Sequence, residues 1–226
     1  MIKAIARSIL SSLGYEIRKK YERGFYAPYL AKLCSPKTVI DVGIGNGTHE
    51  LYKAFPRAKF VLIEPLTEFQ DSIKKILSSY NAMVYYKALG RQSGQMEIEV
   101  NTADPLLSSF NKRPGQAAAS YKKQIEVTTL NQIFKDNSQF DEPILLKIDT
   151  EGHELEVLAG ASEVLNRIDT VILEVSIRKR FENSYDFAEI INFMHSHGFK
   201  VFDFLTICYE KDVPGANLTD IVFKRK

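Results

Sequence analysis

The chain has 226 residues, and its 45% hydrophobic and 26% charged residues are typical of a folded globular protein and exclude a disordered chain. No apolar run approaches the roughly 20 residues of a membrane-spanning helix, and a net charge of +2 argues against a dedicated nucleic-acid binder. The two cysteines, Cys34 and Cys208, have no metal-type spacing. We therefore expect a cytoplasmic protein with free thiols.

Residues 1–37 form a basic segment, with eight Lys and Arg residues against two Glu residues. Apolar residues from Ile2 to Leu13 recur at helical spacing, and a second helix is expected over Phe25–Leu33. A basic amphipathic helix can lie on a membrane surface, so residues 1–14 are a candidate peripheral membrane contact. Docking of this helix on its own domain is the simpler interpretation. Lys3 and Arg7 interrupt the apolar run, so we expect no signal peptide.

From Thr38 onward, short apolar runs alternate with helical stretches. The expected strands are Thr38–Val42, Lys59–Ile63 and Met83–Ala88, and the expected helices between them are Thr48–Phe55 and Thr67–Ser79. This alternation predicts βαβ units, and hence an α/β fold with a doubly wound, mostly parallel sheet.

Two half-buried strands, Gln95–Val100 and Gln124–Thr128, interrupt this rhythm. The stretch between them, Asn101–Lys123, is rich in Ser, Ala, Pro and Gly, which predicts an inserted β-hairpin with a long tip. The alternation then resumes with the strands and helices Ile144–Ile148, Glu154–Leu165, Thr170–Val175 and Asp186–His197, followed by two antiparallel strands, Phe199–Phe204 and Asn217–Phe223. The sequence thus predicts one domain over residues 38–226 and an N-terminal helical extension over residues 1–37.

A glycine-rich loop, Asp41-Val42-Gly43-Ile44-Gly45-Asn46-Gly47, joins the first strand to the first helix of this domain. In doubly wound sheets the ligand lies at the carboxyl ends of the strands, where glycines let the backbone approach it closely. A dinucleotide site would need a glycine where Thr48 stands, and no Gly-Lys-Ser/Thr follows as a P-loop requires. The Asp41 carboxylate would repel a pyrophosphate but suits the cationic amino group and sulfonium of S-adenosylmethionine (SAM). We therefore expect SAM to bind here, with Asp41, Gly43, Gly45 and Asn46 in its site.

Glu64 and Pro65 follow the second expected strand. An acid about 20 residues after the glycine loop hydrogen-bonds ribose hydroxyls in nucleotide-binding α/β folds, which predicts that role for Glu64. The end of the third strand, around Ala88, is expected to border the adenine ring, mainly through its backbone. These residues complete the predicted cofactor site.

The most distinctive stretch is Lys147-Ile148-Asp149-Thr150-Glu151-Gly152-His153-Glu154. Asp149 ends an apolar strand beside the glycine loop, so it could orient SAM or accept a proton from the substrate. Glu151 and His153 are the other candidate bases. A divalent metal bound by Asp149, Glu151 and His153 is an alternative. The spacing matches no metal signature, so we expect no metal.

These motifs together resemble the FkbM-type methyltransferases over about residues 38–176, most specifically in the Lys-Ile-Asp-x-Glu-Gly-x-Glu element. The resemblance implies a class I methyltransferase fold that uses SAM and typically methylates hydroxyl oxygens of polyketides, sugars or other glycans. It also implies that Asp41, Gly43, Gly45 and Glu64 bind SAM and that Asp149 and Glu151 line the active site.

The sequence therefore predicts a SAM-dependent O-methyltransferase that releases S-adenosylhomocysteine (SAH). A substrate hydroxyl would attack the methyl group in line, with Asp149 or Glu151 as the base. The alternatives are a non-catalytic SAM-binding regulator and an NAD-dependent oxidoreductase. Two basic stretches, Arg178–Arg180 and Lys112-Arg113, are expected near the ligand face. They are equally consistent with attraction of an anionic acceptor and with ordinary solvated surface charge.

Overall fold

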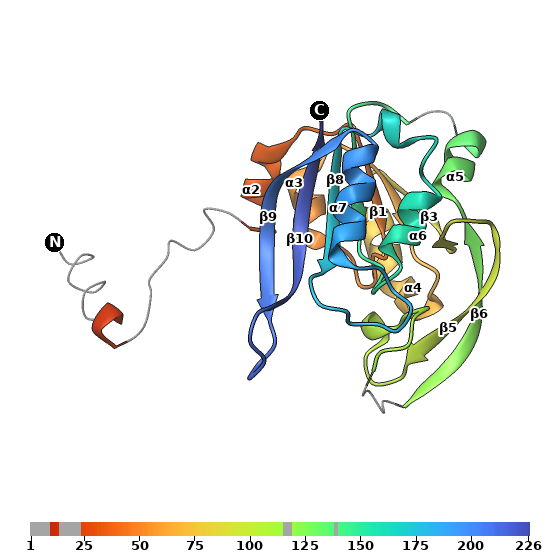
Figure 1. The fold of residues 1–226 in the computed structure, drawn as a ribbon. Helices are drawn as coiled ribbons and strands as arrows, with labels where there is room; N and C mark the ends of the chain where they lie inside the picture. Colours follow the sequence, from red (N-terminus) through yellow and green to blue (C-terminus); the bar gives the residue numbers. More distant parts are fainter. Residues whose placement is uncertain (1–9, 14–23, 115–118, 138–139) are drawn as a thin grey trace.

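The structure is a computed structural model that describes residues 10–13, 24–114, 119–137 and 140–226. Its centre is a seven-stranded sheet in the order β3-β2-β1-β7-β8-β10-β9 (Figure 1). The parallel strands are β1 (Thr38–Val42), β2 (Lys59–Ile63), β3 (Ala82–Tyr85), β7 (Ile144–Ile148) and β8 (Thr170–Ser176). Strand β10 (Ala216–Arg225) runs antiparallel to β8 and to the edge strand β9 (Phe199–Tyr209). The predicted α/β fold with a mostly parallel sheet is confirmed.

Helices cover both faces of this sheet (Figure 1). One layer holds α2 (Ala27–Leu33), α3 (His49–Ala54) and α4 (Gln70–Ser79). The short 3₁₀ helix η1 (Thr67–Phe69) directly precedes α4 in the chain. The other holds α5 (Leu130–Asp136), α6 (Glu154–Ala159) and α7 (Phe187–Ser196). Strand β1 is buried on both sides, with Val39 in one apolar cluster and Ile40 in the other. This burial explains why the central strands read as continuous apolar runs.

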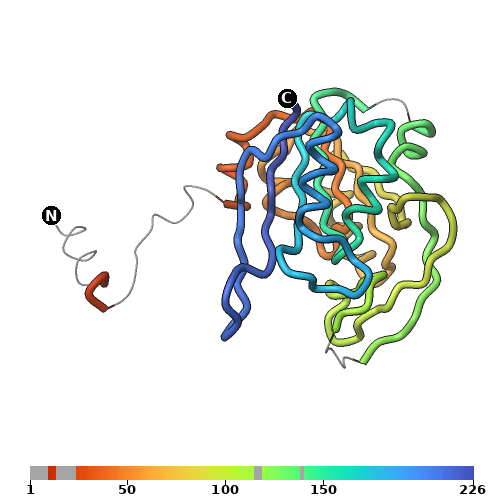
Figure 2. The backbone as a smooth tube through the Cα atoms, in the orientation of Figure 1, coloured from red at the N-terminus to blue at the C-terminus, as the bar shows by residue number. Residues whose placement is uncertain are grey.

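A second sheet of three strands, in the order β4-β6-β5, carries the predicted insertion. Strands β5 (Gly94–Asn101) and β6 (Ser120–Thr128) form the hairpin, and the 3₁₀ helix η2 (Pro105–Leu107) lies in the segment that joins them. Figure 2 shows this hairpin on the opposite side of the molecule from the β9–β10 hairpin. The strand expected over Met83–Ala88 is divided, because β4 (Ala88–Leu89) leaves the main sheet and pairs with β6.

Several predicted bounds were wrong for tertiary reasons. The helix expected over Glu154–Leu165 ends at Ala159, because the carbonyl of Gly160 accepts a hydrogen bond from the backbone amide of Asn131, and the chain then turns into η3 (Leu165–Arg167). Helix α5 was not predicted. Strand β9 extends past Phe204 to Tyr209 because β10 pairs with it that far.

The N-terminal helix expected up to Leu13 lies outside the described residues except for residues 10–13. The helix expected over Phe25–Leu33 is present from Ala27. In the described parts of the chain, no helix is long and apolar enough to cross a membrane.

Candidate active site

A cavity of about 400 Å³ opens at the carboxyl ends of β1, β2, β7 and β8. Its wall combines the glycine loop, the loop after β7 and the tip of the inserted hairpin. The charged residues in the wall are Glu64, Lys87, Lys147, Asp149, Glu151, Glu174 and Asp220. The cavity therefore lies where the sequence predicted the ligand, and acidic groups dominate its charge.

The glycine loop has a backbone that only glycines adopt easily. Gly43 and Gly45 have φ angles of 74° and 49°. A Cβ on Gly43 would lie 1.8 Å from the carbonyl oxygen of Asp149, so the loop after β7 packs directly on the glycine loop. Gly43, Gly45 and Gly47 line the cavity, and at these three positions only backbone can face a ligand. Asn46, which was expected in the site, is exposed and accepts a hydrogen bond from Ser72 outside the cavity wall.

Asp41 lies beneath the cavity and is not part of its wall. It is fully buried, and its Oδ2 accepts a hydrogen bond of 2.8 Å from the Tyr52 hydroxyl. The Nζ of Lys147 lies 3.8 Å from its Oδ1. Burial raises the pKa of this carboxyl, and the Lys147 charge opposes that shift. Asp41 was expected to face the ligand, but its carboxyl is buried below the cavity and faces Tyr52 and Lys147 instead.

Lys147 is the central cation of the site, and the sequence analysis assigned it no role. Its Nζ donates to Asp149 Oδ2 at 3.1 Å and lies near Asp41 as described above. Burial lowers the pKa of Lys147, but the charges of Asp149 and Asp41 outweigh burial and hold this pKa above its usual value. The sequence did contain a sign of this role, because Lys147 is the one charged residue in the otherwise apolar strand Ile144-Leu145-Leu146-Lys147-Ile148.

Glu64 is held by two backbone amides at the cavity wall. Its Oε2 accepts from the Gly45 amide and its Oε1 from the Leu66 amide, both at 2.9 Å. Burial raises the pKa of Glu64 to about 7 against the effect of these amides. The carboxylate oxygens keep further lone pairs that can accept from ribose hydroxyls. Pro65 and Ala88, the other predicted cofactor residues on this side, also line the cavity.

Three carboxyl groups, of Asp149, Glu151 and Glu174, lie together at the other end, with oxygen atoms within 4.8 Å of one another. Arg180 donates to Glu151 at 3.0 Å and to Glu174 at 3.2 Å, and Arg113 donates to Glu151 at 2.8 Å. The three carboxyl groups could hold a metal ion, but the Arg180 guanidinium already bonds to two of them. Burial and the neighbouring acids raise the pKa of Glu174 to about 8.

The loop that carries Asp149 and Glu151 is held in place by hydrogen bonds from its own backbone to Glu154. Glu154 is 1% exposed, and its Oε1 accepts from the backbone amides of Thr150 and Gly152. Glu151 has a positive φ of 50°, and Gly152 packs on the Phe181 ring, where a Cβ would lie 2.5 Å from Cδ2. The second glutamate of the motif thus holds the turn that presents Asp149 and Glu151.

His153 lines the same cavity on the side of Ala88 and Leu89. The residue is buried, and its ring lies 4.8 Å from the Phe110 ring, centroid to centroid. Burial lowers the pKa of His153 to about 4. The imidazole is therefore neutral at pH 7.

The remaining wall is apolar and comes from distant parts of the chain. Its members include Phe25, Leu66, Phe69, Leu89, Ile98, Leu106 and Phe110. Leu106 lies at the tip of the inserted hairpin, and Phe25 precedes α2. Neither residue was predicted, because only the tertiary fold brings these segments over the glycine loop. An apolar wall beside Glu64 suits a flat heteroaromatic base attached to a ribose.

Comparisons with known proteins relate this chain to methyltransferases. The model of the methyltransferase FkbM domain matches residues 41–201. The hexuronic acid methyltransferase AglP of Haloferax volcanii is 28% identical over 140 residues, which cover 60% of this chain and 54% of that protein. The chain thus matches about half the length of this curated relative.

A solved methyltransferase structure has a similar fold. The methyltransferase FkbM from Methylobacillus flagellatus KT aligns with a TM-score of 0.51 and 20% identity, over 84% of this chain and 43% of that chain. Fibrillarin from Aeropyrum pernix, solved with SAM bound, aligns with a TM-score of 0.48 and 11% identity, over 97% of this chain and 74% of that chain. The family match spans more than half of the chain and includes the glycine loop, Glu64 and the Asp149–Glu154 loop. The chain belongs to the FkbM family of SAM-dependent methyltransferases.

Proposed function

We propose that this protein transfers the methyl group of SAM to a hydroxyl oxygen of a sugar or a similar polyhydroxylated small molecule. The observation that carries this proposal is the group of carboxyls at one end of the cavity, in which Asp149 lies against the glycine loop. Among the described residues, only Lys147 hydrogen-bonds to the Asp149 side chain, through Oδ2. The Oδ1 atom of Asp149 is therefore available to a hydroxyl group of the methyl acceptor.

The residues present fit SAM at three points. The glycine loop lets backbone approach a ligand, Glu64 offers lone pairs to ribose hydroxyls, and the apolar wall suits the adenine ring. When bound, SAM supplies an electrophilic methyl group on a good leaving group. Alignment of the acceptor then provides most of the rate acceleration.

In this proposal Asp149 removes the hydroxyl proton at Oδ1 while Lys147 holds Oδ2 in place. Proton removal by a positioned base contributes roughly 10²–10⁴-fold. Glu151 is less suited to this role, because Arg113 and Arg180 both donate to its Oε2. We assign Glu151 the task of fixing the inserted hairpin and the loop after β8 around the acceptor.

A sugar acid is the acceptor class that we favour within this proposal. The relative AglP is named as a hexuronic acid methyltransferase. Arg178 and Lys179 directly precede Arg180, which donates to two acids of the cavity wall, and neither is in an ion pair of the described residues. Such charge favours an anionic acceptor over a neutral one at low salt.

The test is transfer from SAM carrying a ¹³C-labelled methyl group to a panel of hexuronic acids, neutral hexoses, nucleotide sugars and hydroxylated polyketides. We expect SAH formation with a uronic acid and a labelled methyl on oxygen, identified by its NMR coupling to a ring carbon. Asp149→Asn should stop the transfer, whereas Asp141→Asn, at an exposed position outside the cavity, should not.

Other outcomes decide between the alternatives. A labelled methyl on nitrogen would refute O-methylation. SAH binding without turnover on any acceptor would favour the non-catalytic regulator, and binding of NAD in place of SAH would favour the oxidoreductase.

A further inference from the structure

Phe25 belongs to the segment before β1, yet it lines the cavity of the methyltransferase domain. Contacts fix the chain on both sides of it. Gly24 packs on β9, where an added Cβ would lie 3.3 Å from the backbone oxygen of Leu205. The backbone amide of Ala27 donates to Glu50, in the first turn of α3, at 2.8 Å. Phe25 is therefore held between β9 and the helix that follows the glycine loop.

The neighbours of Phe25 on β9 connect it to the carboxyl groups of the site. The hydroxyl of Thr206, which follows Leu205 in β9, donates to Asp220 of the cavity wall. Asp220 pairs with Glu174 across β10 and β8. Oxygen atoms of Glu174 and Asp149 lie within 4.8 Å of each other. Phe25 therefore lies toward the end of the cavity where methyl transfer is proposed.

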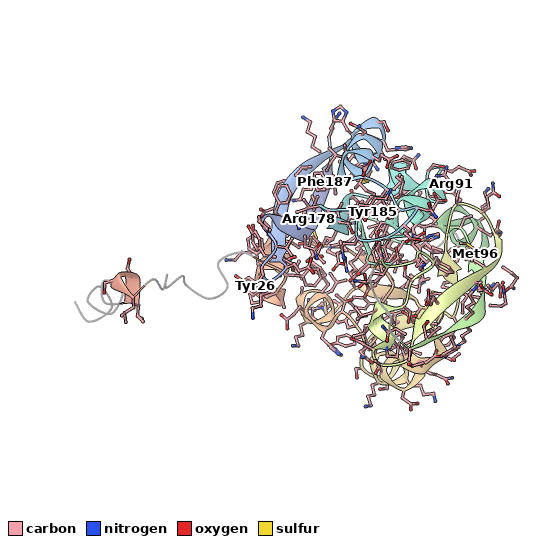
Figure 3. All side chains as sticks on the ribbon, turned by 60° about the horizontal axis from the view of Figure 1, so that its bottom comes forward. Tyr26, Arg91, Met96, Arg178, Tyr185 and Phe187 are labelled. Atoms are coloured by element: carbon pink, nitrogen blue, oxygen red, sulfur yellow. The ribbon has the colours of Figure 1, made fainter. Side chains whose placement is uncertain are left out.

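The ribose position at Glu64 is much farther from Phe25. Glu64 directly follows β2, and the sheet order β2-β1-β7-β8-β10-β9 puts five strand spacings between β2 and β9, which amounts to about 24 Å. A phenylalanine side chain covers less than half of that distance. Figure 3 shows the neighbouring Tyr26 toward the same side of the molecule as Arg178 and away from Met96 of the inserted hairpin. Phe25 thus lies beyond reach of a ribose held at Glu64.

We propose that Phe25 is an acceptor-binding residue whose ring packs against one face of the acceptor's sugar ring. This inference rests on the proposed transfer to a sugar hydroxyl. The C–H groups of a sugar ring form an apolar face, and their weakly positive hydrogens suit the negative face of an aromatic ring. Asp149 would take a hydroxyl at the edge of the same sugar ring.

The surroundings of Phe25 prepare it for this role. The residue is partly buried and packs on an apolar cluster that includes Leu30 and Leu205. Its ring is thereby ordered before the acceptor arrives, so little conformational freedom is lost on binding. The N-terminal extension then acts as one wall of the acceptor site, although the sequence pattern separates it from the domain.

The amino-acid end of the cofactor is the rival ligand for Phe25. Thr48 also lines the cavity and directly precedes α3, to which the chain after Phe25 is bonded. Separate measurements on cofactor and acceptor decide between the two ligands. Tyr26→Ala is the matched control, because it removes the next aromatic ring in the chain. Tyr26 is outside the cavity wall and stacks on Tyr29 with ring centroids 6.1 Å apart.

The experiment measures methyl transfer to D-glucuronic acid, or to whichever sugar of the panel is methylated fastest, by the wild-type chain and the variants. We expect Phe25→Ala to raise the acceptor KM about tenfold, the loss usual for an aromatic anchor in a binding site. The dissociation constant for SAH should stay within about twofold of wild type. Phe25→Trp, which keeps a flat ring, should recover most of the affinity, and Phe25→Leu should recover little. Tyr26→Ala should keep the acceptor KM within about twofold.

A second readout uses fluorescence. The chain contains no tryptophan, so Phe25→Trp introduces the only one. We expect its emission to stay unchanged when SAH is added and to change when the acceptor is added to the SAH complex. A purely structural role for Phe25 would lower the melting temperature of Phe25→Ala and leave the acceptor KM as it is.

Two results would overturn the inference. An acceptor KM for Phe25→Ala within twofold of wild type would remove Phe25 from the acceptor site. A tenfold loss of SAH affinity in Phe25→Ala, or an emission change of Phe25→Trp on SAH alone, would assign the residue to the cofactor. The proposed function fails in a different way, because the wild-type chain would then methylate no sugar of the panel.

Discussion

The pKa of Glu64 makes cofactor binding depend on pH. In the free protein this pKa is raised to about 7 by burial, so the carboxyl is partly protonated near neutrality. A protonated carboxyl is a poorer acceptor for two ribose hydroxyls than a carboxylate, so we expect SAH to bind the ionised form. About one tenth of the sites are ionised at pH 6 and about nine tenths at pH 8 for a pKa near 7. The dissociation constant for SAH should therefore be about tenfold larger at pH 6 than at pH 8.

The raised pKa of Glu64 also affects the stability of the free protein. Rising pH favours SAH binding, but it lowers the free energy of unfolding of the free protein. The folded pKa lies above the ordinary glutamate value of 4.5, so the folded state binds more protons between about pH 4.5 and 7. The free energy of unfolding contributed by this group should fall as pH rises through that window. The full change is about 3 kcal/mol at 1.36 kcal/mol per pKa unit.

Calorimetry in two buffers of different ionisation enthalpy measures both the affinity and the protons released. We expect nearly one proton released per SAH bound at pH 6 and almost none at pH 8. Glu64→Gln should bind SAH weakly and lose the pH dependence. Glu97→Gln, which removes an exposed acid paired with Lys122 outside the cavity, should keep it. An affinity that is flat from pH 6 to pH 8 in the wild type, or a slope that persists in Glu64→Gln, would show that ionisation of Glu64 does not control SAH binding.

Three further outcomes follow from the same geometry. Asp149→Asn should lower turnover at saturating SAM by about 10²–10⁴-fold while SAH affinity stays within a few fold, and turnover within threefold of wild type would remove its role as base. Gly43→Ala should lose SAH binding and melt at a lower temperature, because its Cβ would lie 1.8 Å from the Asp149 carbonyl oxygen, and normal binding would contradict this packing. Chelation with EDTA should leave turnover unchanged, because Arg180 already bonds to Glu151 and Glu174, whereas a loss restored by Mg²⁺ or Mn²⁺ would identify a metal site.

Local patterns were enough to predict most of the fold. Strands such as Thr38–Val42 and Ile144–Ile148 were predicted with the bounds that the structure has, because strands buried on both faces are continuous apolar runs. The end of α6 depends on a hydrogen bond from Asn131 to the carbonyl of Gly160, which joins two segments far apart in the sequence. No local pattern encodes such a contact, so helix bounds of this kind were wrong.

In the candidate site too, some residues could be predicted from local patterns and others depend on tertiary contacts. Asp149 was predicted in the site because it ends a strand beside the glycine loop, and Glu64 because it follows that loop by about 20 residues. The position of Lys147 between two carboxylates depends on which strands are neighbours, because β7 pairs with β1 so that Lys147 lies opposite Asp41. The sequence order does not state that pairing. A charged residue in a buried strand was nevertheless a usable sign that a partner lies on the next strand.

The pairing of Asp41 with Lys147 also changes the electrostatic argument for SAM. Asp41 cannot by itself attract the sulfonium, because Lys147 offsets its charge. The attraction falls instead to the cavity wall beside the glycine loop, where Asp149 shares the single charge of Lys147 with Asp41, while the arginines pair with Glu151 and Glu174. Methyl transfer removes the positive charge on sulfur, so this wall should favour SAM over SAH and assist release of the product. We expect SAM to bind several-fold more tightly than SAH at low salt, with the difference shrinking as salt screens the wall. Equal affinities at every salt concentration would mean that the excess acids are protonated and do not act on the cofactor's charge.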